Sequence, residues 1–237
     1  MNSSATCSPK ISALATAAVL TAILFAASAN AQQLQRGISV EMATARNASP
    51  MPAADEDDAW VVAVTADGSI YFGTDKMSGP ELTDTIRTMP HKRDQHLFIK
   101  ADARATFASL KPVLGAARDC YFKTPVLLTS QPVPAPPGTI VPAKGFEVMV
   151  VPQADQTLVQ LSNDGKTPDG KMSLWIDGKP APWPDFEGTL NTALQKRGSK
   201  LIQIEPGDSV PFAAIVRVID AAKANGASVA LPAFHAL

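Results

Sequence analysis

The sequence predicts a mixed α+β fold: two small modules in tandem, each a sheet with two helices on one face, after one N-terminal apolar helix. A strand-and-helix pattern occurs twice, first from Ile99 as IKADARATFASLKPVLGAARD and 105 residues further on, from Ile204, as IEPGDSVPFAAIVRVIDAAKA. Twenty prolines and 14 glycines fall mostly between apolar runs, which an all-helical protein would not tolerate. With 237 residues, 46% of them hydrophobic, the chain can fill one large core or two small ones.

Composition excludes some classes of function. The 21 basic and 22 acidic residues nearly cancel, so the chain has no electrostatic footprint for nucleic acid. The two cysteines, Cys7 and Cys120, lie too far apart for a metal knuckle or a disulfide framework. Two unrelated free thiols are the favoured interpretation, and pairing of Cys120 with the same residue of a second copy is the alternative in an oxidising compartment.

The N-terminal segment, residues 1–31, is predicted to be a membrane anchor or a signal peptide. Residues 11–31 carry no charge, and Lys10 is the only basic residue ahead of them. About 20 apolar residues can just cross a bilayer, yet this run ends in Ala29-Asn30-Ala31, a small-x-small pattern typical of signal-peptidase cleavage. In both cases the positive flank stays in the cytoplasm, so the chain after about residue 32 is expected outside it.

Residues 32–58 are predicted to be a stalk that carries one strand. Apolar residues alternate at Ile38, Val40 and Met42, within polar sequence. The acidic run from Asp55 to Asp58 is interpreted as a solvated loop rather than a metal site. An open strand edge can pair with another chain. The candidate partner-pairing strand consists of Ile38, Ser39, Val40, Glu41 and Met42.

Module 1 is expected to span residues 59–130. Asp67-Gly68 favours a turn with positive φ between two apolar runs, which predicts a hairpin. A helix is predicted to follow, with Ser78 as its N-cap and Glu81 completing a capping box.

A strand, a second helix and a returning strand complete module 1. These elements are predicted to form a crossover unit with parallel strands and a helix on one face. Pro112 is expected to strain or kink the second helix.

The predicted linker, residues 131–144, contains five prolines that favour an extended spacer rather than a sheet. Module 2, residues 145–237, repeats the order of module 1. Leu190 and Leu194 match Leu82 and Ile86 of the first helix. The apolar stripe of the last helix consists of Phe212, Ile215, Ile219 and Ala222.

The segments VVAVTADGSIYFG and LFIKADARATFASLKPVLGAARD, with the strand that follows, resemble the periplasmic domain of the ExbD/TolR biopolymer-transport family. The segment QRGISVEMATA is similar to the family's post-membrane segment, so the resemblance covers residues 11–130. Module 2 is a weaker match, with Gly207 where module 1 has Asp102. A tandem arrangement departs from the family's usual single copy.

The resemblance implies a single-pass inner-membrane protein that joins an ExbB/TolQ-like membrane protein and a TonB/TolA-like protein, forms dimers, and helps couple the proton gradient to envelope transport. Family members typically carry one aspartate in the membrane helix. The corresponding stretch here, around Ser12 to Thr16, has no ionisable residue. An ionisable group within a membrane is retained for function, so its absence argues against proton conduction by this chain.

No catalytic motif or cofactor site is found, and the chain is not expected to be an enzyme. His91, His96 and His235 lack partners at metal-ligand spacing. Asp102 and Asp208, each ahead of a helix, are acid/base candidates, but helix capping or dipole pairing is favoured. The tryptophans are interpreted as packing residues, although they could form a stacking surface for a sugar or a partner; they are Trp60, Trp175 and Trp183.

The function expected from these observations is an ExbD/TolR-like accessory subunit, a non-catalytic periplasmic scaffold held in the bacterial inner membrane by one span. The alternative is a protein cleaved after Ala31 and secreted into the periplasm, where it binds peptidoglycan or a partner protein. The chain is expected to form a homo-oligomer or, because of the duplication, an intramolecular pseudo-dimer.

Overall fold

The computed structural model describes residues 32–33, 36–90, 95–122, 124–133, 136, 139–151, 154–163, 172–197 and 200–232. Within them the fold is α+β, as the sequence predicts, with two main sheets and four helices. The apolar run of residues 11–31 lies outside the described residues.

Module 1 has a sheet in which β3 (Trp60–Val64) lies between an antiparallel and a parallel neighbour. The hairpin β3–β4 (Ile70–Phe72) turns at Gly68, whose φ is 84°, and β5 (Asp75–Met77) extends it. On the other side, β6 (Leu97–Ala101) is parallel to β3, and β7 (Val126–Thr129) is parallel to β6. The predicted hairpin and parallel crossover are therefore confirmed.

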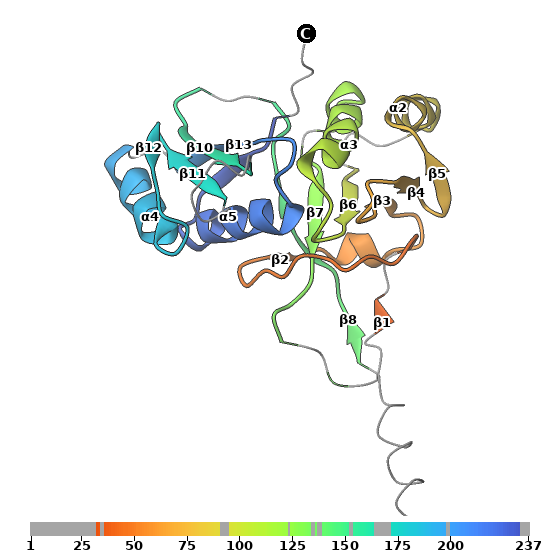
Figure 1. The fold of residues 1–237 in the computed structure, drawn as a ribbon. Coiled ribbons are helices and arrows are strands. Elements are labelled where there is room, and N and C mark those ends of the chain that lie inside the picture. The colour runs from red at the N-terminus through yellow and green to blue at the C-terminus, as the bar shows by residue number, and fades with distance from the viewer. Residues whose placement is uncertain are drawn as a thin grey trace, which may run out of the picture.

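Module 2 repeats this order of strands. The strands β12 (Lys179–Pro180), β11 (Ser173–Ile176), β10 (Thr157–Ser162), β13 (Leu201–Pro206) and β14 (Ser228–Ala230) follow one another across its sheet. Here too the first two pairs are antiparallel and the last two are parallel. The two sheets lie side by side (Figure 1).

Two helices accompany each sheet at equivalent points of the chain. Module 1 has α2 (Gly79–Thr88) and α3 (Phe107–Asp119), and module 2 has α4 (Phe186–Arg197) and α5 (Phe212–Ala224). Ser78 caps α2 in a capping box with Glu81, as predicted. α3 continues through Pro112; the carbonyl that lacks a donor there belongs to Ala108, an exposed residue.

The linker is not only a spacer. Its residues Ile140–Val141 form β8, which pairs in parallel with β1 (Gln32–Gln33). β9 (Lys144–Glu147) joins the sheet of module 1 antiparallel to β7, and β2 (Ser49–Pro50) pairs with β9. The prediction that this segment avoids sheets was wrong for Ile140–Val141 and for Lys144, because these residues are not prolines and keep the backbone N–H groups that pairing requires.

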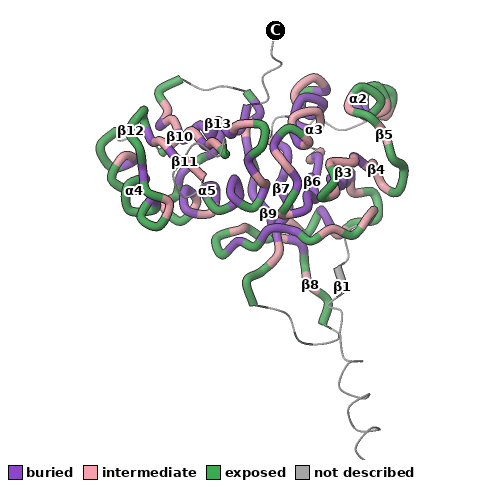
Figure 2. The backbone as a smooth tube through the Cα atoms, in the orientation of Figure 1, coloured by how far each residue is buried: buried purple, intermediate pink, exposed green. Residues whose placement is uncertain are grey.

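The main hydrophobic core is continuous across both modules, and buried residues concentrate in the strands and the facing sides of the helices (Figure 2). The predicted apolar matches are buried: Leu82, Ile86, Leu190, Leu194, Phe212, Ile215, Ile219 and Ala222. A smaller cluster lies on the other face of the module 1 sheet, where Met42 and Ala54 pack with Val61 and Phe98. The stalk thus covers the sheet face that the helices leave open.

Candidate functional site

The segment that leads from the N-terminal region into the folded part is bound along its length, and we call residues 36–47 the docked segment. Of the five residues of the candidate partner-pairing strand, Ile38 and Val40 are half-buried, Ser39 and Glu41 are exposed, and Met42 is buried. They do not form a continuous strand. Met42 makes an isolated antiparallel bridge to Asp102, and Thr44 makes a parallel one to Ser130. Pairing of this segment with another chain stays a prediction.

Asp102 holds the middle of the docked segment. It follows β6, and only 4% of its surface is exposed. Its carboxylate accepts hydrogen bonds from the Arg104 guanidinium (Nε to Oδ1, 2.9 Å; Nη2 to Oδ2, 3.0 Å) and from the Arg104 backbone N–H at 3.0 Å. The backbone N–H of Glu41 donates to Oδ2 at 3.3 Å, and the Glu41 carbonyl accepts from Ala103 N–H at 2.7 Å.

Charge reinforces this arrangement. The Glu41 carboxylate lies 3.6 Å from Arg104, so one guanidinium faces two carboxylates. The hydrogen bond from the Arg104 side chain is the main reason why the pKa of Asp102 lies below its ordinary value, since burial alone would raise it. The pKa of Arg104 is raised, first by the same hydrogen bond. Asp102 is therefore held in its ionised, accepting form.

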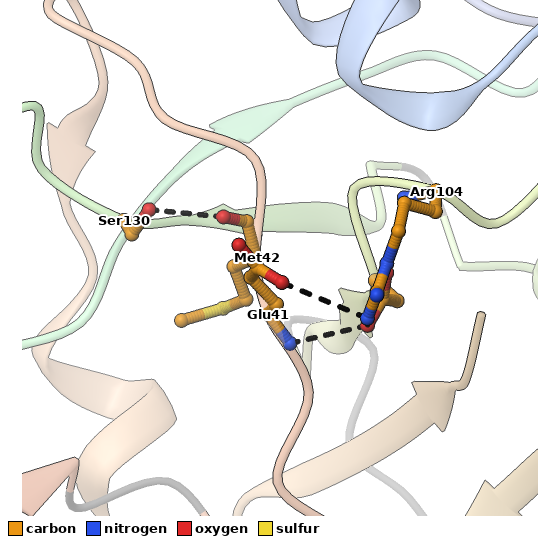
Figure 3. Close-up of polar contacts among 5 residues, drawn as sticks. Glu41, Met42, Arg104 and Ser130 are labelled. Carbon is orange, nitrogen blue, oxygen red and sulfur yellow. Dashed lines mark hydrogen bonds and ion pairs between the residues drawn. The ribbon is translucent and has the colours of Figure 1, made fainter.

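The other side of the docked segment is held by Ser130, at the end of β7. Its hydroxyl donates to the Met42 carbonyl at 3.0 Å, and its backbone N–H donates to the Ala43 carbonyl at 3.0 Å. The Ala45 N–H returns a bond to the Ser130 carbonyl, also at 3.0 Å. Figure 3 shows Glu41 and Met42 lying between Arg104 on one side and Ser130 on the other.

The docked segment enters module 1 beside a buried lysine. Lys100 on β6 is 1% exposed, and its ammonium donates to the Arg36 carbonyl at 3.1 Å. Burial lowers the pKa of Lys100. The neighbouring Gly37 has φ of 87°, and a Cβ there would lie 2.6 Å from the Gly73 carbonyl oxygen. Only glycine fits this approach without a shift of backbone.

The close approach of Gly37 to the Gly73 carbonyl leads to a prediction about stability. Gly37→Ala is expected to lower the free energy of unfolding by about 2–3 kcal/mol, because it combines left-handed backbone strain with a clash against main chain. Gly73→Ala is the matched control, since Gly73 has φ of 63° but no atom within 4 Å of its Cβ position. The control should lose only about 1 kcal/mol in urea denaturation. Equal losses for the two variants would contradict the clash.

The far end of the docked segment reaches module 2. Asp220 on α5 accepts backbone hydrogen bonds from Arg46 (3.1 Å to Oδ1) and Asn47 (2.7 Å to Oδ1). The Asn47 side-chain amide donates to the same carboxylate oxygen at 3.2 Å. The docked segment therefore binds Asp102 and Ser130 in module 1 and Asp220 in module 2. A displacement of the docked segment would change contacts in both modules.

Helix capping or dipole pairing was favoured for two aspartates, and neither of them forms a side-chain cap. The N-cap of α3 is Thr106 and that of α5 is Pro211, without a side-chain capping bond in either case. Asp102 binds Arg104 and the docked segment instead, because the turn after β6 points its carboxylate there. The Asp208 side chain contacts the Lys111 ammonium of the other module. Sequence reasoning missed Arg104, Ser130 and Asp220, which carry no motif.

The remaining candidates are dispersed. His96 is half-buried with its Nδ1 3.1 Å from the Thr124 carbonyl oxygen, whereas His91 and His235 lie outside the described residues. Trp60 packs in the core against Phe72, and Trp183 stacks on Phe186. Trp175 lies on β11, half-buried.

Cys120 and the acidic run also have structural explanations. Cys120 is a buried free thiol whose pKa is raised, mainly by burial, and Cys7 lies outside the described residues. Asp55 accepts from the Ala143 N–H at 2.9 Å, and Asp57 pairs with Arg36. Among the described residues, no group of His, Cys, Asp or Glu is arranged to hold a metal ion. Nor does the described part of the chain contain a helix both long and apolar enough for a membrane crossing.

Comparison with known proteins gives one family. The family described as biopolymer transport protein ExbD/TolR matches residues 6–132 and, a second time, residues 134–234. No curated protein and no solved structure matches the chain. The two matches together span nearly the whole sequence, and their order agrees with the repeated order of strands and helices in the two modules. The chain belongs to the ExbD/TolR family of biopolymer transport proteins and carries the family's pattern in tandem duplicate.

Proposed function

We propose that the protein is a non-catalytic periplasmic scaffold of an envelope transport complex coupled to the proton-motive force. Residues 1–31 would be its single inner-membrane span, followed by the stalk (32–58), module 1 (59–130), the linker (131–144) and module 2 (145–237). Membership of the family supports an accessory role in biopolymer transport. Family members typically work at the inner membrane with ExbB/TolQ-like and TonB/TolA-like partners, and we propose the same partners here.

The observation that carries this proposal is the attachment of the docked segment. A movement of the membrane span would reach the two modules through residues 36–47, which are bound by both of them. In this proposal the hydrogen bonds between the main chain of the docked segment and Asp102, Asp220 and Ser130 transmit the displacement mechanically, without catalysis. Residues 11–31 carry no ionisable side chain, so in this proposal the proton-responsive group belongs to the partner and not to this chain.

A second function is favoured by one feature of the sequence. Ala29-Asn30-Ala31 is a suitable cleavage site, and cleavage would release the modules into the periplasm as a binding protein for peptidoglycan or a partner protein. In this alternative the fold is the same, but the protein does not work with an ExbB/TolQ-like membrane protein.

The first experiment is to determine the N-terminal residue of the mature protein in fractionated cells and to identify what co-purifies with it. The scaffold predicts an intact N-terminus in the inner-membrane fraction, together with an ExbB/TolQ-like protein. A start at Gln32 in the soluble periplasmic fraction would contradict the scaffold and favour the binding protein. The purified chain is then incubated with peptidoglycan, where retention without release of fragments indicates a binder and release of fragments indicates an enzyme.

A further inference from the structure

The two modules meet through equivalent segments of the duplicated sequence. Residues 103–108 comprise the turn before α3 and the first two residues of that helix. Residues 208–213, which lie 105 positions later, have the same relation to α5. We call them the paired segments. Thr106 forms an antiparallel bridge with Pro211, its own equivalent. Four backbone hydrogen bonds surround it: Phe107 N to Val210 O (2.9 Å), Phe212 N to Ala105 O (2.8 Å), Ala108 N to Asp208 O (3.0 Å) and Ala213 N to Ala103 O (2.9 Å).

These hydrogen bonds are related by a pseudo-twofold axis. Exchanging each residue for the one 105 positions away turns the bond between Phe107 and Val210 into the bond between Phe212 and Ala105. The same exchange relates the other two bonds. Such reciprocity is the property of an isologous interface, in which two subunits present the same patch to each other. Nothing in the packing of two unrelated domains would produce it.

We infer that the paired segments are a subunit interface carried within one chain, and that the partner which fits module 1 at this surface is module 2 rather than a second copy of the protein. This inference concerns assembly and does not depend on the transport role. One chain would then correspond to a dimer of modules that has one N-terminal segment instead of two.

Side chains at the interface discriminate between like and unlike pairs. The Lys111 ammonium contacts the Asp208 carboxylate across the pseudo-twofold axis. The reciprocal positions are Val216 and Ala103, which have no charge. Pairing of two module 1 surfaces would place Lys111 opposite Ala103, and pairing of two module 2 surfaces would place Val216 opposite Asp208. The two repeats have therefore diverged toward pairing with each other.

Contacts beyond the paired segments make the association mutual. β9 comes after most of the linker and within the second family match, yet it pairs with β7 in the sheet of module 1. In the other direction, Arg46 and Asn47 of the docked segment bind Asp220 of module 2. Each half thus contributes backbone to the other, and the hydrophobic core runs through both.

The test uses the full chain in mild detergent with a recognition site for a specific protease inserted after Val133, a residue that is 75% exposed. Light scattering is expected to give the mass of one chain, and the same mass after complete cleavage of the inserted site. An intact chain that remains a dimer at nanomolar concentration would overturn the inference. Cut halves that separate at micromolar concentration would overturn it as well.

Charge reversal then locates the association at the paired segments. In the cut protein, Lys111→Glu should raise the dissociation constant of the two halves about fivefold, because it places two negative charges together. Adding Asp208→Lys to this variant should restore the association. Lys196→Glu makes the same charge change on the exposed side of α4 and serves as the control. Equal weakening by Lys111→Glu and Lys196→Glu, or no rescue by the double variant, would refute this location.

Discussion

Asp102→Ala is expected to lower the free energy of unfolding by about 2–3 kcal/mol, the range for lost hydrogen bonds to a buried charged group. The Glu41 and Arg104 backbone N–H groups lose their acceptor, and the Arg104 guanidinium loses its main partner. Glu41→Ala is the matched control. It removes only an exposed ion pair with Arg104 and keeps the backbone bond, so it should cost under about 1 kcal/mol in urea denaturation. An Asp102→Ala variant as stable as this control would contradict the role of Asp102.

The same carboxylate gives a pH dependence with a defined sign. The pKa of Asp102 is lower in the folded chain than the ordinary value of 3.8, so its contribution is fully present above that value. The contribution is lost as the pH falls from there through the lowered pKa, because the unfolded chain then binds the proton first. Urea denaturation from pH 7 to pH 2 should show a shallower acid-side loss for Asp102→Asn than for the unaltered chain.

Asp67 must be controlled for in this measurement. Its pKa is lowered to about 2, first by the hydrogen bond from the Thr65 side chain, and it titrates in the same window. The comparison is therefore made in chains that already carry Asp67→Asn. If Asp102→Asn leaves the acid-side loss unchanged in that background, the carboxylate does not hold the docked segment in the way described.

Phe146→Ala is expected to lower the free energy of unfolding by about 3–5 kcal/mol. Phe146 lies on β9, is 1% exposed and packs in the main core. Truncation leaves a cavity where the second half of the chain enters the sheet of module 1. Phe146→Leu is the control and should cost less than about 1.5 kcal/mol, because it keeps most of the volume.

The measurement for Phe146 uses two probes. Trp60 reports on module 1 and Trp183 on module 2, since each packs within its own module. Single-tryptophan versions should unfold at the same urea concentration, and Phe146→Ala should shift both transitions together. A shift confined to one tryptophan would contradict a shared core, and a loss below about 1 kcal/mol would contradict the burial of β9.

Local patterns predicted the elements of each module well. The capping box of Ser78 and Glu81, the turn at Gly68 and the apolar stripe of α5 each depend on residues within a few positions of one another. Such signals are readable because helix caps, tight turns and helical periodicity are short-range properties of a chain. The repeat itself is also a sequence property, and it predicted the matching order of strands.

The candidate site was only partly predictable. The docked segment was singled out by alternating apolar residues, but those residues do not form the strand that was expected. Asp102 was noticed as a residue ahead of a helix, although its partners, Arg104 and the Glu41 N–H, come from a turn and from a segment 61 residues away. The assignment failed because a carboxylate can accept from any donor that the fold brings near it.

The sequence by itself determined the duplicated α+β architecture, the family, the near-zero net charge and the position of prolines and glycines between apolar runs. Only the tertiary structure decided that β9 enters the sheet of module 1, that Asp220 holds the stalk and that the two repeats pair through their own equivalent residues. The physical reason is that each of these contacts uses at least one backbone group and joins residues far apart in the chain. Every backbone N–H and C=O has the same pairing chemistry, so the choice of partner is made by three-dimensional packing and leaves no local mark on the sequence.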